Sequence, residues 1–259
     1  MTRRLLPLKR HKIDILGVGV DDFSQKEALD MVLRLVQDRK STHYVVTVNS
    51  EFVMLARKNK DFADILQKAD LALADGWWLA QSKLIWGGKR RERIAGVDLV
   101  ENLCKEAGEK AVRVGFLGGF GSVATKVAER QKMSFPNLKI AFAGAGDPTI
   151  GYDSRLKMAL DKAGRIDILF VAYGMGQQEF WIGRNLKKLD VGVFIGVGGA
   201  FDYISRVKRR APEFLQNLGF EWLWRLINEP QRIWRMKVLP VFLILVILKF
   251  LKPKISYKS

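Results

Sequence analysis

Residues 45–76 read VVTVNSEFVMLARKNKDFADILQKADLALADG: a β-branched run, a helical region and a second apolar run. Polar residues follow both apolar runs directly, Asn49 after the first and Asp75 after the second. Ligands of open α/β sheets bind outside the carboxyl ends of the strands. We therefore predict that Thr47, Asn49 and Asp75 form one wall of an active site. Asp75 is the candidate general base, because a carboxylate in a partly apolar cleft can be tuned to accept a proton, although Asp-Gly is also a common turn.

Apolar segments suited to strands alternate with amphipathic helical segments along most of the chain. Strands are predicted over residues 13–20, 45–48, 71–74, 112–117, 139–143, 166–172 and 191–196. The spacing from Ser24 to Glu27 is that of a capping box, which predicts a helix start. Because the strands are almost wholly apolar and helices separate them, we predict an α/β fold: a Rossmann-like, largely parallel sheet with helices on both faces.

The chain changes character after residue 204, which divides it into two predicted parts. Residues 1–204 form the α/β catalytic domain, and residues 205–259 form an appendage rich in Trp and Arg. The appendage carries 12 Lys and Arg against 3 Glu, so it holds +9 of the net charge of +17. Its apolar segment, 238–251, is shorter than the roughly 20 residues that a spanning helix needs. We predict a helical, monotopic or shallowly inserted membrane anchor; the alternative is a buried core helix.

The net charge of +17 predicts an anionic partner, whether nucleic acid, acidic lipid or a phosphorylated substrate. Further basic clusters lie at residues 3–12 and 89–93, and no apolar segment suited to a signal peptide follows the first of them. The single cysteine, Cys104, excludes an internal disulfide and is expected to be a core thiol. With only His11 and His43 beside it, little remains for a zinc site.

Two glycine-rich segments follow predicted strands and carry candidate donor contacts. The segment 115–124 includes Gly118 and Gly119 and runs into a helix N-terminus. It fits a diphosphate site or a tight turn without a ligand equally well, and it does not match G-x-G-x-x-G. The segment 196–202 includes Gly198, Gly199 and Asp202. Asp202 fits either a contact with a ribose or base, or a helix cap.

A third segment, 173–179, also joins a strand to a helix. Gln178 can both donate and accept hydrogen bonds, which suits sugar hydroxyls. The next residue, Glu179, can instead complement the dipole at the start of a helix. Spacing alone leaves the two interpretations open.

Together these segments resemble the WecG/TagA/CpsF glycosyltransferase family over roughly residues 13–236. The resemblance rests on several blocks in the same order, not on one motif. The blocks are Thr47-Val-Asn-Ser-Glu51, Ala69-Asp70 through Asp75-Gly76, Glu92-Arg-Ile-Ala-Gly-Val-Asp98, Gly115-Phe-Leu-Gly-Gly119, Gly151-Tyr152, Gln178-Glu179, Val197-Gly-Gly-Ala-Phe-Asp202, Arg210-Ala-Pro212, Leu218-Gly-Phe-Glu-Trp222, Arg225-Leu226, Glu229-Pro230 and Arg232.

The resemblance implies an enzyme at the cytoplasmic face of the cell membrane, attached peripherally or as a monotopic protein. It would move an N-acetylmannosamine-type sugar from a UDP-sugar to N-acetylglucosaminyl-diphospho-undecaprenol, in cell-surface polysaccharide or teichoic acid-type synthesis. Transfer would invert the anomeric centre and need neither a metal nor another cofactor. The resemblance implies Asp75, Thr47, Asn49 and Gln178 for catalysis, Arg93 for the donor, and Arg225, Arg232 and Arg235 for diphosphate or lipid. From their places after predicted strands, we add as donor contacts Gly118, Gly119, Glu179, Gly198, Gly199 and Asp202.

Departures from the family pattern leave the donor sugar open. Gly176 and Gln177 stand where the family usually has Pro and Lys, which removes a rigid turn and a positive charge. A small-residue–Gly step before the Arg-Ala-Pro block is Ser205-Arg206 here. The patterns do not decide whether the chain forms a homo-oligomer.

Two other classes of protein fit parts of the pattern. A Rossmann-type oxidoreductase needs a complete phosphate-binding fingerprint, which is missing, and would bind NAD. A basic nucleic-acid-binding protein would lose affinity steeply with salt. Because the aromatic residues cluster with the apolar tail and not with an RNA-reading motif, we expect no nucleic-acid partner.

Overall fold

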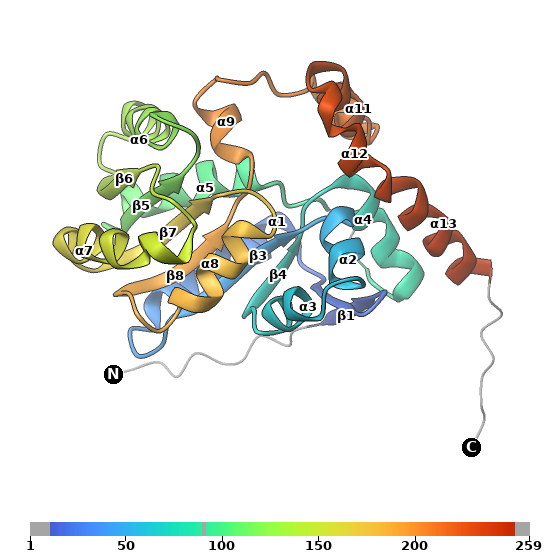
Figure 1. Ribbon diagram of the computed structural model, residues 1–259, viewed down its shortest axis with the longest axis horizontal. Coiled ribbons are helices and arrows are strands. Elements are labelled where there is room, and N and C mark those ends of the chain that lie inside the picture. Colours follow the sequence, from blue (N-terminus) through green and yellow to red (C-terminus); the bar gives the residue numbers. More distant parts are fainter. Residues whose placement is uncertain (1–10, 90–91, 252–259) are drawn as a thin grey trace.

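The computed structural model describes residues 11–89 and 92–251 (Figure 1). Parts of two predicted basic clusters, 3–12 and 89–93, therefore lie outside the described residues. The same holds for the start of the predicted catalytic domain and the end of the predicted appendage. Eight strands form one sheet in the order β1-β2-β4-β3-β8-β7-β5-β6, in which only β1 and β2 pair antiparallel. The strands are β1 Lys12–Ile15, β2 Val18–Asp21, β3 His43–Val48, β4 Leu71–Ala74, β5 Arg113–Gly118, β6 Lys139–Gly144, β7 Ile166–Ala172 and β8 Val191–Gly196. The predicted largely parallel sheet is confirmed.

The first predicted strand, 13–20, is wrong as a single element. The chain turns at Leu16 and Gly17, which have φ of 55° and 91°, so β1 and β2 form a hairpin. Two-residue hairpin loops with positive φ at both positions match the twist of the flanking strands. A leucine rarely adopts this conformation, and the run of apolar residues around Leu16 concealed the turn.

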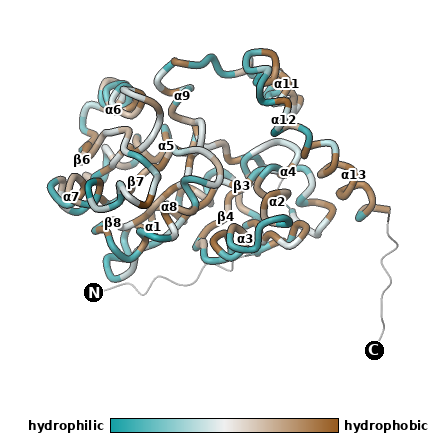
Figure 2. The backbone as a smooth tube through the Cα atoms, viewed as in Figure 1, coloured by the Kyte–Doolittle hydropathy of each residue, from teal (hydrophilic) through white to brown (hydrophobic). Residues whose placement is uncertain are grey.

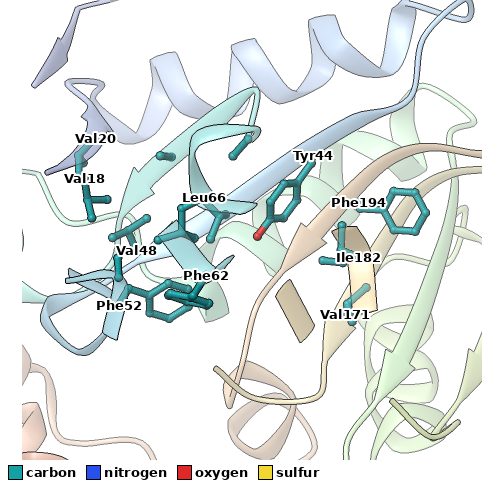
Figure 3. Close-up of a cluster of buried hydrophobic side chains, with 14 of the residues drawn as sticks. Val18, Val20, Tyr44, Val48, Phe52, Phe62, Leu66, Val171, Ile182 and Phe194 are labelled. Carbon is teal, nitrogen blue, oxygen red and sulfur yellow. The ribbon is translucent and has the colours of Figure 1, made fainter. Parts of the chain in front are cut away.

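Helices cover both faces of the sheet, as predicted, and each face has its own core. One face packs against α1 Gln25–Gln37, α5 Gly96–Glu109, α6 Val123–Ser134 and α9 Ala200–Ile204. The other packs against α2 Ser50–Ala56, α3 Lys60–Gln67, α4 Trp77–Ser82, α7 Asp153–Ala163 and α8 Gln177–Asn185. Figure 3 shows part of this second core, where Phe62 lies against Phe52 with ring centroids 5.6 Å apart.

Local sequence signals were confirmed where they concern these elements. The Ser24 hydroxyl accepts from Glu27 N at 3.2 Å, and the Glu27 carboxylate accepts from Ser24 N at 2.8 Å, so the capping box starts α1. Cys104 is a fully buried free thiol in α5. The described residues also form three short 3-10 helices. Two lie before the appendage, η1 Lys83–Trp86 and η2 Ile150–Tyr152, and one lies within it, η3 Pro230–Arg232.

The appendage leaves the sheet after α9 and crosses to the side of α2 and α4 (Figure 1). Its α-helices are α10 Glu213–Asn217, α11 Glu221–Asn228, α12 Ile233–Met236 and α13 Val238–Leu251. Helix α13 packs on α2 and η1 and buries Leu239, Phe242 and Val246. Its other side exposes Ile244, Ile247 and Phe250, so the helix is mostly hydrophobic in Figure 2, with Lys249 in its last turn.

This arrangement lies between the two predictions for 238–251. One side of α13 belongs to the core, while the opposite side exposes large apolar side chains to solvent. None of the helices in the described ranges is both long and apolar enough to cross a membrane.

Candidate active site

A cleft of about 640 Å³ runs along the carboxyl ends of the parallel strands. It is lined, in the order of the sheet, by the ends of β4, β3, β8, β7 and β5. Residues of the appendage also line it. It brings together every predicted site residue except Gly118 and Glu179. These residues are Thr47, Asn49, Asp75, Arg93, Gly119, Gln178, Gly198, Gly199, Asp202, Arg225, Arg232 and Arg235.

Asp75 is positioned by the end of β4 and by the sharp turn into α4. Its backbone N–H donates to the carbonyl of Val48 at 2.7 Å, which continues the sheet for one residue. Gly76 then adopts φ of 102° and begins α4, a conformation that favours glycine. The Asp-Gly pair is a turn after all, but a turn that leaves the carboxylate in the cleft, with 24% of its side chain exposed.

The charges around Asp75 nearly balance. Arg93 Nε lies 3.5 Å from Asp75 Oδ1, and Arg93 Nη2 lies 2.5 Å from Glu221 Oε2 in the appendage. Burial raises the pKa of Asp75; Arg93 and Arg225 oppose this, and Glu221 reinforces it. The pKa of Asp75 is raised overall, which brings it closer to the pKa that suits a general base at neutral pH.

Thr47 and Asn49 lie on the neighbouring strand end and are both partly committed to the fold. The Thr47 hydroxyl donates to the carbonyl of Gly196 at 2.9 Å and ties β3 to β8. The Asn49 side-chain oxygen accepts from Phe52 N at 3.2 Å and caps α2. The oxygen thus holds one bond of the cap, while the amide NH2 of Asn49 remains available to donate to a ligand.

Gln178 and Glu179 are more deeply buried than their predicted roles require. Gln178 is 1% exposed, its Oε1 accepts from Gly198 N at 2.9 Å, and its Nε2 donates to Glu179 Oε1 at 2.7 Å. Glu179 is fully buried and also accepts from Gly176 N at 2.6 Å. Burial raises the pKa of Glu179 to about 7, although these hydrogen bonds oppose the shift. Glu179 thus lies beneath the cleft wall and has no surface for the predicted donor contact.

The two glycine segments differ in what they offer. A Cβ on Gly118 would lie 2.7 Å from the backbone of Ala172, so this glycine permits close packing of β5 on β7 beneath the cleft. The N–H of Gly119 donates to the carbonyl of Ala172 at 3.0 Å. Asp202 lies inside α9 and does not cap it; it pairs with Lys208 at 2.8 Å and faces the cleft.

The predicted arginines of the appendage reach the cleft, and each is paired with a carboxylate. Arg225 bonds to Glu221 and stacks over the ring of Tyr203, 5.1 Å from its centroid. Arg232 Nη1 lies 3.5 Å from Glu229 Oε2. Arg235 Nη2 lies 2.8 Å from the Oε2 of Glu51, a residue of α2.

A smaller pocket of about 100 Å³ adjoins the cleft at Asp75. Asp75, Arg93, Arg225 and Arg232 line both spaces. The rest of the smaller pocket is largely apolar and leads to the start of α13. Its aromatic and aliphatic lining residues are Trp77, Trp78, Trp222, Met236, Val238 and Leu239.

Several residues of the cleft have no strong sequence signal. Lys208 bridges Asp202 and Glu229, at 2.8 and 3.0 Å, from a connection that reads as solvent-exposed and basic. Phe120 lines the cleft and is 94% exposed. It lies in a glycine loop from which only the glycines were predicted to contact the donor. Tyr203 was overlooked because its partner, Arg225, comes from a different part of the chain. Asp147, after β6, also lines the cleft.

The cationic groups of the cleft belong to Arg and Lys side chains. Within residues 11–89 and 92–251, no group of three or more His, Cys, Asp or Glu side chains is arranged to hold a metal ion.

The chain is similar to known proteins over most of its length. A model of the glycosyl transferase WecG/TagA/CpsF family matches residues 13–256. A protein of Bacillus spizizenii (strain ATCC 23059 / NRRL B-14472 / W23) is 33% identical over 231 residues, covering 87% of this chain and 88% of the relative. A protein of Staphylococcus aureus (strain MW2) is 26% identical over 237 residues, covering 90% of this chain and 91% of the relative. Both are named N-acetylglucosaminyldiphosphoundecaprenol N-acetyl-beta-D-mannosaminyltransferase.

Proposed function

Because this chain belongs to the WecG/TagA/CpsF family of glycosyltransferases, we propose that it transfers an N-acetylmannosamine-type sugar from a UDP-sugar to N-acetylglucosaminyl-diphospho-undecaprenol. The acceptor and the sugar are those that the names of the two relatives specify. The transfer inverts the anomeric centre and uses no metal ion.

One observation carries the proposal: a carboxylate with a raised pKa shares one cleft with arginines from a different part of the chain. Asp75 belongs to the sheet edge, whereas Arg225 and Arg232 belong to the appendage. Glycosyl transfer from a nucleotide to an alcohol needs both a base for the alcohol and positive charge for the leaving diphosphate. The cleft offers both within one space.

The reaction that fits this arrangement is a single displacement. An acceptor hydroxyl gives its proton to Asp75 while its oxygen bonds to the anomeric carbon of the donor. The bond from that carbon to the diphosphate oxygen breaks, and UDP leaves with the electron pair. Attack from the face opposite the leaving group inverts the centre, so the β-linked product in the names of the two relatives requires an α-linked donor.

The leaving diphosphate would be met by cations that now hold carboxylates. Arg225, Arg232 and Lys208 are paired with Glu221 or Glu229. A diphosphate offers more charge and more acceptor oxygens than either carboxylate, and like a carboxylate it can accept bidentate contacts from guanidinium groups. We expect the substrate to replace these internal partners, so the positive charge is available without a metal.

Donor and acceptor would approach Asp75 from opposite sides. The larger space lies over the strand ends and their glycine segments and suits the UDP-sugar, with Arg93 and Asp202 among its contacts. The smaller, aromatic pocket leads toward α13 and suits an acceptor that arrives on a lipid. Asp75 lines both spaces, as a base that acts on the acceptor hydroxyl must.

The appendage is proposed to seat the enzyme on the cytoplasmic face of the membrane, peripherally or as a monotopic protein. Large apolar side chains are exposed along it, and basic side chains near an anionic surface add about 1 kcal/mol each. An exposed apolar patch next to basic residues is typical of a helix that lies in the interface. The exposed side chains include Phe214, Leu218, Ile227, Trp234, Ile244, Ile247, Leu248, Phe250 and Leu251.

The test is a transfer assay with the full-length chain. The lipid-diphosphate acceptor is incubated with a panel of UDP-sugars in the presence of EDTA, and the lipid product is analysed by mass. Transfer of N-acetylmannosamine, or of a related N-acetylated sugar, supports the proposal. Failure of every donor, with and without added divalent metal, would overturn it; activity only with metal would refute metal independence alone. The panel also identifies which donor sugar this chain uses.

A further inference from the structure

Glu179 is a fully buried carboxylate that no step of the transfer uses. Its two oxygens accept from Gly176 N at 2.6 Å and from Gln178 Nε2 at 2.7 Å. The side-chain oxygen of Gln178 in turn accepts from Gly198 N at 2.9 Å. A continuous relay therefore joins the start of α8 to the loop between β8 and α9, and that loop lines the donor end of the cleft.

We propose that Glu179 is a positioning residue: through the Gln178 amide it holds the backbone of the Gly198–Gly199 loop in the conformation that receives the nucleotide-sugar donor. The inference rests on the proposed donor and extends it. It also changes the role of Gln178, whose amide is engaged with protein partners on both sides and is 1% exposed. Gln178 then acts on the donor through the loop, not through hydrogen bonds of its own to the sugar.

The polarity of the relay has only one solution. The N–H of Gly198 can only donate, so the side-chain oxygen of Gln178 must face it. The NH2 of Gln178 is then turned toward Glu179, whose Oε1 accepts. Gly198 adopts φ of 52°, one of several conformations that glycine reaches without strain, so the hydrogen bond from its N–H to Gln178 helps to select it.

Gln178 and Glu179 also pack closely against the backbone of Gly196 at the end of β8. A Cβ on Gly196 would lie 2.9 Å from Gln178 Nε2 and 3.1 Å from Glu179 Oε1. The two side chains therefore fill the volume beneath the end of β8. A side chain at position 196 would therefore displace the pair.

Three variants separate polarity from packing, because they keep the shapes of the side chains. In Glu179→Gln, two amides lie between two backbone N–H donors, so every orientation leaves one donor facing another. In Gln178→Glu, two carboxylates face each other until one takes up a proton. The double variant, which combines both changes, exchanges the two groups and restores a complete set of hydrogen bonds. The amide at position 179 then donates to the carboxylate at position 178, and each backbone N–H again has an acceptor.

The experiment measures UDP affinity by calorimetry and donor and acceptor KM in the full-length enzyme. Because a buried donor without an acceptor is costly, we expect Glu179→Gln to raise the donor KM and the UDP Kd about 10- to 100-fold, with the acceptor KM unchanged. The double variant should recover most of this loss. Equal loss in the single and double variants, or no loss in Glu179→Gln, would overturn the proposal.

A second readout does not depend on the substrate. Hydrogen exchange at the Gly198 amide, followed by NMR, should be slow in the wild type, faster in Glu179→Gln and slow again in the double variant. Unchanged exchange in Glu179→Gln would contradict the relay even if no sugar were ever transferred. Conversely, the expected exchange pattern without UDP binding would refute the proposed donor and leave the relay standing. If Glu179→Gln does not fold, Gly196→Ala displaces the same pair by contact alone and should give the same exchange and donor phenotype.

Discussion

Arg93 Nη2 lies 2.5 Å from Glu221 Oε2, so the arginine beside the candidate base is held by a carboxylate of the appendage. Glu221 also bonds to Arg225. Burial works to raise the pKa of Glu221, but the two guanidinium groups outweigh it and hold that pKa below its usual value. The appendage is therefore part of the electrostatic environment of Asp75 and not only a means of attachment.

This relationship predicts opposite pH shifts for two substitutions. A base acts only when deprotonated, so activity is present above the pKa of Asp75 and is lost as the pH falls through it. Arg93→Ala removes a positive charge that lowers this pKa, which should move the acidic limb of the kcat/KM profile upward, by about one pH unit. Glu221→Gln removes a negative charge that raises it, which should move the limb downward. Shifts in the same direction would contradict the assignment of that limb to Asp75.

The paired arginines of the cleft predict a sharp contrast within the appendage. Arg232→Ala removes a cation that lines the cleft and is 17% exposed, so kcat/KM should fall roughly 100-fold, as when a donor group that stabilises developing charge is lost. Arg209→Ala removes the same charge from an exposed position of the appendage outside the cleft lining. It should change kcat/KM little. Equal effects of the two variants would show that total charge matters and that the cleft contact does not.

The two sides of α13 predict different consequences. Ile247→Asp with Phe250→Asp alters exposed positions, so sedimentation with anionic liposomes should fall while the thermal midpoint stays close to that of the wild type. Phe242→Ala empties a fully buried site and should cost about 3–5 kcal/mol of unfolding free energy. Unchanged liposome binding in the double aspartate variant would refute the proposal that the exposed side of α13 contacts the membrane.

Removal of the whole appendage is a stronger form of the same test. A chain truncated after Pro212 lacks Glu221, Arg225 and Arg232, and should show no transfer to the lipid acceptor and no liposome binding. Since the truncation uncovers the apolar surface beneath α13, its oligomeric state should be measured beside the wild type. A truncated chain with full activity on the lipid acceptor would refute the role of the appendage in the cleft.

Much of the sheet and one wall of the cleft could be predicted because they follow from local patterns. The strands are continuous apolar runs, and Asn49 and Asp75 are the first polar side chains after two of them. In a parallel sheet such residues share one edge whatever the order of the strands. The resemblance to a family added the appendage arginines, which spacing alone would have left as surface charges.

The features that were missed depend on contacts across the chain or on rare backbone conformations. Leu16 turns a hairpin with φ of 55° and carries no turn signal. Glu179 looks like an ordinary acidic residue at a helix start, and only the packing of Gly196 and Gln178 around it shows that it is buried. The pairing of Arg93 with Glu221 joins distant segments, and no local pattern contains it.

The most direct test of the account is the turnover of Asp75→Asn. This substitution keeps the shape of the side chain and removes its ability to accept a proton, so kcat with the lipid acceptor and the UDP-sugar should fall by about 10²- to 10⁴-fold. The Kd for UDP should stay within a few fold of the wild-type value, and Asp147→Asn, a change in another carboxylate of the same cleft, should retain most of the turnover. A rate for Asp75→Asn close to that of the wild type would contradict the central claim.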